Sequence, residues 1–148
     1  MAHQHFVVGS LLFLASAAPA FGQAPAGRIK AVTGAVAVVR ASTSQPAQAG
    51  QVVLEGDVLR TGSDGRVGVT LKDDTRVSLG PSSELKVDRF SYAPAQGQFG
   101  LVLKVARGVV AYVSGQIAKL APDSIRIETP SAILGVRGTT LAVRVDDK

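Results

Sequence analysis

The side chains able to do chemistry in this 148-residue chain are few. Its two histidines, His3 and His5, lie at the very start of the chain, and cysteine is absent. Ser-His-Asp and Cys-His nucleophile systems and the common zinc sites depend on histidine or cysteine. Carboxylates, lysines and hydroxyl side chains therefore remain as the candidate groups for catalysis or metal binding.

Ser83-Glu84-Leu85-Lys86 matches the pattern S-x-x-K, in which a lysine activates a serine one helical turn away. Here the alternation of Leu85 and Val87 with polar residues predicts a strand. Residues i and i+3 of a strand point to opposite faces, so the lysine would not reach the serine. We expect Ser83 to be a turn residue.

Two groups of carboxylates, Asp73-Asp74 and Asp57 with Asp64, are candidates for Ca²⁺ binding or acid-base work. No D-x-D-x-D series of ligands accompanies them. The glycines around Asp64 lack the lysine and the following helix of a phosphate loop. We expect these carboxylates to be solvated turn residues. The sequence thus predicts no catalytic residue, no metal ligand and no cofactor, and we do not expect an enzyme.

Arg137 is a charged residue between Gly135 and Gly138 in an otherwise apolar run. A guanidinium carries five N–H donors that need partners. It could contact a partner or an anionic ligand, or it could donate to backbone carbonyls and hold a packed corner together. The flanking glycines indicate close backbone approach or a positive φ, which favours the structural interpretation.

Residues 1–22 have the features of a secretory signal peptide. The apolar run of residues 6–18 is too short to span a bilayer, and Ala20 and Gly22 fit cleavage before Gln23. A short uncleaved anchor is the alternative. We expect a domain at residues 23–148 that lacks histidine, is periplasmic or secreted, and has no further membrane-spanning segment.

The formal net charge of +5 belongs to the part of the chain that follows residue 22. Its basic residues are scattered from Arg28 to Lys148, and only 5% of all residues are aromatic, which disfavours a nucleic-acid-binding surface. Weak attraction to anionic envelope polymers, or solubility alone, explains the charge.

Short alternating segments at residues 66–72, 76–79 and 84–88 predict strands that are apolar on one face. The first two are expected to form a hairpin with Asp73-Asp74 as a two-residue loop. Such strands, separated by Gly, Asp and Pro-Ser turns, predict an all-β domain. Periodicity does not decide between a solenoid-like stack of short strands and a jelly-roll or sandwich.

Other segments complete this prediction. Residues 29–40 are expected to form a bent strand broken at Gly34, and residues 116–120 the only helical turn. Residues 41–50 and most of 90–100 show no strand period and are predicted as loops, and Arg107-Gly108 as a turn.

Residues 127–145 form the most distinctive stretch, with two extended segments joined at a tight corner. Pro130 should end the first segment, and Leu141, Val143 and Val145 alternate with polar or small residues in the second. The pattern T-P-x-A-x-x-G-V-R-G-T resembles the signature of the FecR domain, the periplasmic part of regulators of iron-siderophore uptake. The matching residues are Thr129, Pro130, Ala132, Gly135, Val136, Arg137, Gly138 and Thr139.

Segments within residues 56–62, 69–79 and 103–110 also look like the family's pattern, so the resemblance covers roughly residues 30 to 145. It implies an all-β, non-catalytic signalling module of the bacterial envelope. In full-length regulators a cytoplasmic anti-sigma segment and a membrane helix precede this domain. Here a signal peptide stands in their place, and Leu141 stands where the family usually has phenylalanine. We therefore expect a stand-alone, exported FecR-type domain.

Two kinds of partner follow. The first is another envelope protein, such as a receptor or a secretion component, bound by strand addition to an exposed edge, for which residues 140–145 are the candidate. The alternative is an anionic cell-wall glycan or polysaccharide held by the scattered lysines and arginines.

Overall fold

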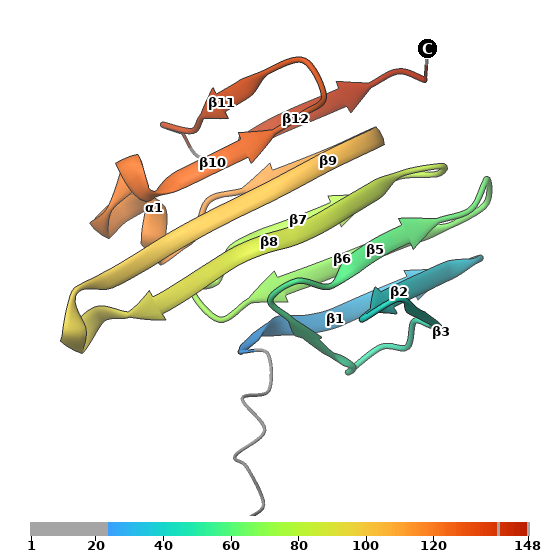
Figure 1. The fold of residues 1–148 in the computed structure, drawn as a ribbon, viewed down its shortest axis with the longest axis horizontal. Coiled ribbons are helices and arrows are strands. Elements are labelled where there is room, and N and C mark those ends of the chain that lie inside the picture. Colours follow the sequence, from blue (N-terminus) through green and yellow to red (C-terminus); the bar gives the residue numbers. More distant parts are fainter. Residues whose placement is uncertain (1–23, 139, 148) are drawn as a thin grey trace, which may run out of the picture.

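The computed structural model describes residues 24–138 and 140–147, so the predicted signal peptide and Thr139 lie outside the described residues. Strands dominate it, which confirms the all-β prediction (Figure 1). The strands are β1 (Pro25–Thr33), β2 (Val36–Arg40), β3 (Thr43–Pro46), β4 (Val52–Leu54), β5 (Val58–Thr61), β6 (Arg66–Leu71), β7 (Arg76–Leu79), β8 (Glu84–Ala93), β9 (Gln98–Val113), β10 (Ile125–Glu128), β11 (Ile133–Gly135) and β12 (Thr140–Val145). The helical turns are η1 (Pro94–Gln96), α1 (Gln116–Leu120) and η2 (Pro122–Ser124).

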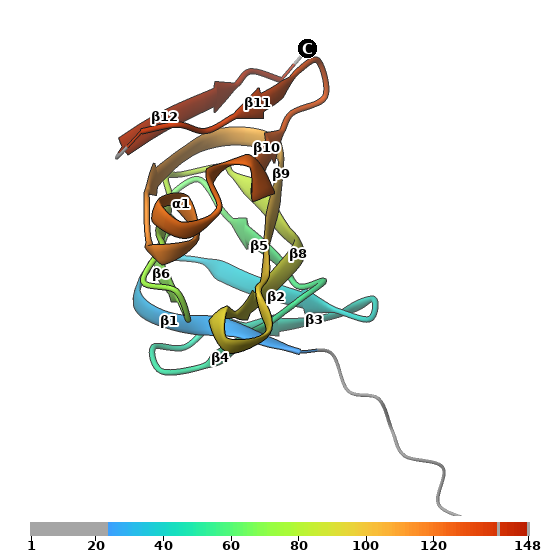
Figure 2. The same ribbon diagram turned by 90° about the vertical axis from the view of Figure 1, so that its left-hand side faces the viewer.

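The long strand β9 divides the sheet into two halves. Its first half pairs with β8 and β10, and beyond β8 follow β5, β2 and β3; we call this half, with β11, the β8 wing. Its second half pairs with β7 and β12, and beyond β7 follow β6, β1 and β4; this is the β7 wing. Figure 2 shows the sheet curled so that the wings lie on opposite sides of the interior.

The curled sheet favours the sandwich-like alternative over a solenoid. Neighbouring strands pair antiparallel, apart from β9 and β10, whereas a stack of repeated rungs pairs strands of one direction. The inward residues of both wings form one apolar cluster, because alternate residues of each strand point to the same face. The largest fully buried side chains include Tyr112, Ile29, Leu59, Leu85, Leu101 and Leu103.

Gly108 explains why β9 can serve both wings. We expected Arg107-Gly108 to turn the chain, and this prediction is wrong, because β9 continues to Val113. Gly108 has a φ of +87°, and a Cβ there would collide with the side chain of Ser83. A glycine in this conformation bends the strand without reversing it.

The bent strand predicted for residues 29–40 is present as β1 and β2, and Gly34 between them has a φ of +66°. The loop predicted for residues 41–50 is partly wrong, because β3 pairs antiparallel with β2. All four residues of β3 are exposed, so no alternation of apolar and polar side chains marked it as a strand.

The predicted hairpin of β6 and β7 is confirmed, although its connection runs from Lys72 to Thr75 and is longer than two residues. The predicted loop within residues 90–100 is instead the tip of the β8–β9 hairpin. There η1 turns the chain, and Gly97 closes it with a φ of +64°. The helical turn predicted for residues 116–120 is confirmed as α1.

Candidate functional site

The strands β10 and β11 form a hairpin that contains the first half of the signature. Pro130 lies in the exposed turn just beyond β10, as expected. The Thr129 hydroxyl accepts the backbone N–H of Ala132 at 3.0 Å, and the Thr129 N–H donates to the Ala132 carbonyl at 2.8 Å. Threonine thus closes the turn with its side chain, which is a common role of this residue type.

The register of this hairpin fixes the direction of each backbone group in β11. Thr129 and Ala132 form a hydrogen-bonded pair, and in an antiparallel pair such positions alternate with non-bonded ones. Ile133 lies opposite Glu128 and Leu134 opposite Ile127. It follows that Leu134 bonds to β10, whereas the N–H and C=O of Ile133 point away from it.

The side chains of β11 divide in the same alternating way. Leu134 packs against the core cluster, and Val136, which follows β11, is 5% exposed. Ile133 is 68% exposed, although isoleucine is among the residues most often buried. Because β11 pairs only with β10 among the described strands, Ile133 presents both a free backbone edge and an apolar side chain.

The strand β12 forms a second edge, on the β7 wing, and pairs with β9 alone among the described strands. Gly80 donates its N–H to the Val109 carbonyl at 2.9 Å, so the odd-numbered residues of this half of β9 bond to β7. The even-numbered residues then bond to β12, through Leu141 and Val143. Ala142 and Arg144 direct their N–H and C=O groups outward. Both edges therefore come from the signature stretch and the strand that follows it.

The corner between the two edges differs from the expected one. A Cβ added at Gly135 or at Gly138 would meet nothing within 4 Å, and neither residue has a positive φ. The interpretation that these glycines mark close backbone approach is therefore wrong. The corner is held instead by the buried Val136 and by the Ser114 hydroxyl, which donates to the Gly138 carbonyl. Thr139, the last signature residue, lies outside the described residues.

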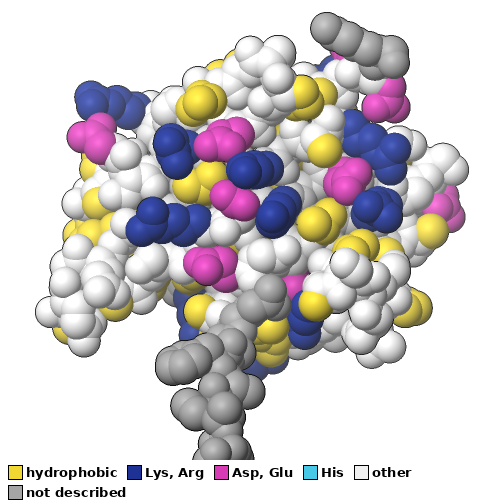
Figure 3. Space-filling model, in the orientation of Figure 1, with side chains coloured by type: hydrophobic (Ala, Val, Ile, Leu, Met, Phe, Trp, Pro, Cys, Tyr) yellow, Lys and Arg dark blue, Asp and Glu magenta, His cyan; other side chains and the backbone are white. Residues whose placement is uncertain are grey.

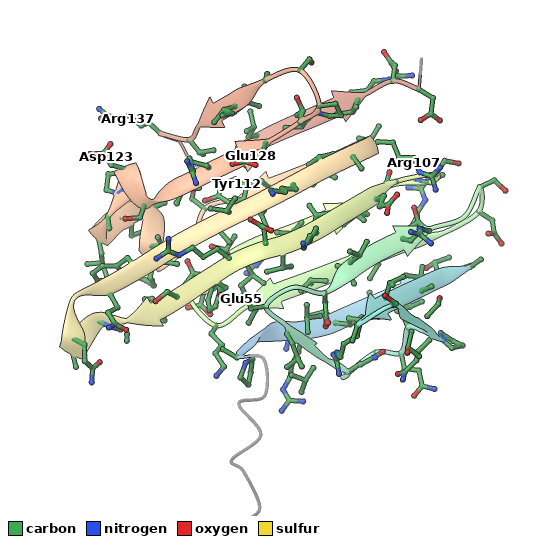
Figure 4. All side chains as sticks on the ribbon, viewed as in Figure 1. Glu55, Arg107, Tyr112, Asp123, Glu128 and Arg137 are labelled. Atoms are coloured by element: carbon green, nitrogen blue, oxygen red, sulfur yellow. The ribbon has the colours of Figure 1, made fainter. Side chains whose placement is uncertain are left out.

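Arg137 also differs from the structural interpretation. Its side chain is 78% exposed and forms an ion pair with Asp123 of η2 at 2.9 Å (Figure 4). It does not sit in a packed corner, and its partner is a carboxylate where backbone carbonyls were expected. An exposed ion pair of this kind stabilises a fold by about 0–1 kcal/mol, so the guanidinium remains accessible to a binding partner.

A shallow groove of about 400 Å³ lies on the β8 wing, beside the end of β10 and the turn that leads to β11. Charged side chains from three strands line it together with Thr129 and Pro130 of the signature. Lys104 on β9 pairs with Asp88 at 3.5 Å and with Glu128 at 3.9 Å, and Arg60 pairs with Glu84 at 3.0 Å. Charges of both signs alternate on this face (Figure 3). The groove therefore has little net charge of either sign.

The candidate nucleophile Ser83 has a structural role. It is fully buried; its hydroxyl donates to backbone carbonyls and accepts the N–H of Val109 at 2.9 Å. Lys86 instead pairs with Asp88 at 3.5 Å. The S-x-x-K residues therefore do not form a nucleophile and base pair, as the strand argument predicted.

Two of the candidate carboxylates are buried, so the prediction of solvated turn residues is wrong for them. Asp57 is 0% exposed and accepts Arg40 through both oxygens at 2.9 and 2.8 Å, which raises the pKa of Arg40. Asp73 is also 0% exposed and accepts N–H or O–H groups of Thr75 and Ile117. Asp74 is exposed, as expected. Each buried carboxylate thus links separate segments of the fold.

Within residues 24–138 and 140–147, no group of three or more His, Cys, Asp or Glu side chains is arranged to hold a metal ion. In the same part of the chain, no helix is long and apolar enough to cross a membrane.

Sequence reasoning missed Ile133 as a site residue. Residues 132–134 are all apolar, so the sequence gives no alternation to tell the outward residue from the inward one. The register set by Thr129 supplies that information, and it depends on the turn geometry.

Comparison with known proteins gives one match. The family model described as FecR protein matches residues 57–148, which include the groove and both edge strands. No curated protein and no solved structure matches the chain.

Proposed function

This chain belongs to the FecR protein family, and on that premise we propose that it is an exported, non-catalytic signalling module that binds another envelope protein. The family is one of signalling regulators, and the signal-peptide features of residues 1–22 support export to the periplasm or beyond. The proposed mode of binding is strand addition along β11, in which a partner segment extends the β8 wing by one strand.

The observation that carries this proposal is the position of Ile133. Its outward N–H and C=O offer a template for an added strand, and its side chain is 68% exposed. A free strand edge is a liability that proteins usually cover or blunt with charge or proline. Here β11 begins with the exposed isoleucine and ends with a glycine, and it contains no charged residue or proline that would blunt the edge.

The expected partner is an extended segment with an apolar residue next to Ile133. Each backbone hydrogen bond formed contributes about 0.5–1.5 kcal/mol, and burial of the isoleucine side chain contributes about 1.5–3 kcal/mol. The groove lined by Lys104 and Glu128 reaches the turn that precedes β11 and can accept charged groups of either sign from the partner. The signature residues Thr129, Pro130 and Val136 would then act by holding β11 in place.

The strand β12, which the sequence analysis put forward as the binding edge, is the second candidate. Its outward groups at Ala142 and Arg144 are accessible, but its large apolar residues, Leu141, Val143 and Val145, all contact the core. We therefore favour β11, and the following test separates the two edges.

The test uses proline, which removes one backbone donor. Ile133→Pro removes the outward N–H donor of β11, and Ala142→Pro removes an outward N–H donor of β12. Neither change removes a hydrogen bond to the neighbouring strand. A photoreactive side chain at Ser131, in the exposed turn beside β11, identifies the partner in the bacterial envelope. Binding of that partner by each variant is then measured, with thermal unfolding to verify the fold.

We expect Ile133→Pro to abolish binding and Ala142→Pro to leave it unchanged. Ile133→Lys, which keeps the N–H but places a charge at the edge, should weaken binding by at least about tenfold. Loss of binding only in Ala142→Pro would move the site to β12. Normal binding by all three folded variants would exclude strand addition.

A further inference from the structure

The two wings carry charge in different ways. The strands of the β7 wing present Arg28, Lys30, Arg66, Arg76 and Arg144 and contain no Asp or Glu residue within the described part of the chain. The strands of the β8 wing mix both signs. Its acidic residues are Glu84, Asp88 and Glu128. The two wings therefore differ in whether carboxylates accompany the cations: the strands of the β8 wing contain them and those of the β7 wing do not.

Ion pairing increases this difference. On the β8 wing, six of the seven basic residues of the strands lie within 3.9 Å of a carboxylate oxygen, namely Arg40, Arg60, Lys86, Lys104, Arg107 and Arg126, and Arg89 has no such partner among the described residues. On the β7 wing, Arg28, Lys30, Arg66 and Arg76 form no ion pair with any residue in 24–138 or 140–147. Arg144 pairs with Asp146, which lies beyond the end of β12. The outer face of the β7 wing thus presents four cations that have no ion-pair partner among the described residues.

The cations stand on both sides of a row of small, outward-facing residues. The register places Ala31, Gly68, Ser78, Ala111 and Ala142 opposite one another in a row across the wing. Arg66 lies in the next row on one side, and Arg28 and Arg76 lie in the next row on the other side. A groove of about 340 Å³ follows this row and includes Arg66 and Thr33 in its lining. Rows on the same face are about 7 Å apart, so the row of Arg66 and the row of Arg28 and Arg76 are about 14 Å apart, which leaves room for one polymer chain between them.

We propose that this face binds a linear acidic polysaccharide, whose chain lies in the groove across the strands. Its carboxylates would pair with Arg66 on one side and with Arg28 and Arg76 on the other. Hydroxyl groups of Thr33 and Ser78 are placed to bond to sugar hydroxyls. This surface is distinct from the β11 edge of the proposed function and does not depend on it.

Other occupants fit less well. An extended peptide is recognised through a strand edge or side-chain pockets, and the groove crosses the strands over a floor of small side chains. A membrane surface calls for apolar side chains that insert, whereas the large apolar residues of this face are Val109 and Val113, at 41% and 39% exposure. A second copy of the chain that docked through the same face would bring like charges together, since the strands of this wing contain no Asp or Glu residue.

The test measures binding of the full chain to polygalacturonate over about 50 to 200 mM salt. Arg66→Gln combined with Arg76→Gln removes cations from both sides of the groove. Arg60→Gln combined with Arg126→Gln is the matched control, because it removes the same charge from the β8 wing. Poly-glutamate and anionic phosphatidylglycerol vesicles are the competing probes, and circular dichroism verifies that each variant is folded.

We expect the β7-wing variant to bind polygalacturonate about tenfold more weakly and with a shallower salt dependence, and the control to bind as the unmodified protein does. Equal losses in the two variants would show attraction to net charge alone and would overturn the proposal. Stronger binding to poly-glutamate or to vesicles would assign the face to a protein or a membrane. Absence of polygalacturonate binding at low salt would also refute it.

Discussion

Gly108 and Gly135 show how differently two glycines of one domain constrain the fold. Gly108 combines a φ of +87° with direct contact to Ser83, whereas open space surrounds the Cβ position of Gly135. Gly108→Ala should therefore lower the free energy of unfolding by about 2–4 kcal/mol, through backbone strain and a steric clash. Gly135→Ala should change it by less than about 1 kcal/mol. Urea unfolding of both variants measures this, and similar costs at the two positions would contradict the bend assigned to Gly108.

Tyr112 makes stability depend on pH. Its ring is fully buried, and its hydroxyl has no hydrogen-bond partner within the described residues. Burial, the largest cause, raises the pKa of Tyr112 above its usual value, against the opposing effect of the nearby Ser114 and Thr75 hydroxyls. The unfolded chain then loses this proton at lower pH than the folded one. Stability is unaffected below pH about 10 and falls as the pH rises through the folded pKa.

Tyr112→Phe should remove this fall. At neutral pH the variant should be at least as stable as the unmodified protein, because the substitution removes a buried hydroxyl that has no hydrogen-bond partner. Thermal unfolding at a series of pH values compares the two proteins. If both lose stability equally above pH 10, the buried phenol is not the titrating group.

At the scale of elements, Asp73 determines where α1 lies. One of its carboxylate oxygens accepts the Thr75 hydroxyl at 2.8 Å and the Ile117 N–H at 3.1 Å, and its backbone carbonyl accepts the Gln116 N–H at 2.7 Å. Asp73 thus satisfies two of the N–H groups that the first turn of a helix leaves free, one through its carboxylate and one through its backbone carbonyl. It joins the β6–β7 hairpin to a segment more than forty residues later.

Asp73→Ala should cost about 2–4 kcal/mol of unfolding free energy, because the donors that it satisfies are left buried without a partner. The neighbouring Asp74→Asn is the control. Asp74 is exposed, and asparagine tolerates its φ of +69°. The substitution should therefore change the free energy of unfolding by less than about 0.5 kcal/mol. Urea unfolding followed by circular dichroism compares them, and equal effects would refute the role of Asp73.

The sequence predicted those elements whose side chains alternate. The strands around Val69, Val77 and Leu85 were identified because one face is buried and the other exposed. The strand β3 was missed because no residue in it is buried, and the continuity of β9 was missed because a glycine after a charge is usually a turn signal. Burial of Asp57 and Asp73 depends on long-range partners, which no local pattern records.

At the scale of the whole molecule, function depends on which residues share a face. The sequence shows 16 basic residues scattered along the chain, and their scatter gave no reason to expect a patch. The register of the β7 wing gathers Arg28, Arg66 and Arg76 on one face without a carboxylate, and ion pairs neutralise much of the other face. Separation of this kind follows from strand order and pairing, which local sequence does not determine.

Strand order also places the two edges of the signature stretch at the same end of the molecule, where β11 and β12 run close to one another (Figure 2). The signature residues are mainly turn and corner residues, and we infer that their role is to hold these edges. The central claim is therefore that β11 has a free backbone edge at Ile133 that a partner strand occupies.

Amide hydrogen exchange of β11, resolved by residue, tests this claim most directly. In the free protein the Ile133 N–H should exchange rapidly, whereas the Leu134 N–H, bonded to β10, should be protected. When the partner captured at Ser131 is added, the Ile133 N–H should become protected, by at least about tenfold. Protection of Ile133 in the free protein, or no change there in the complex, would contradict strand addition at this edge.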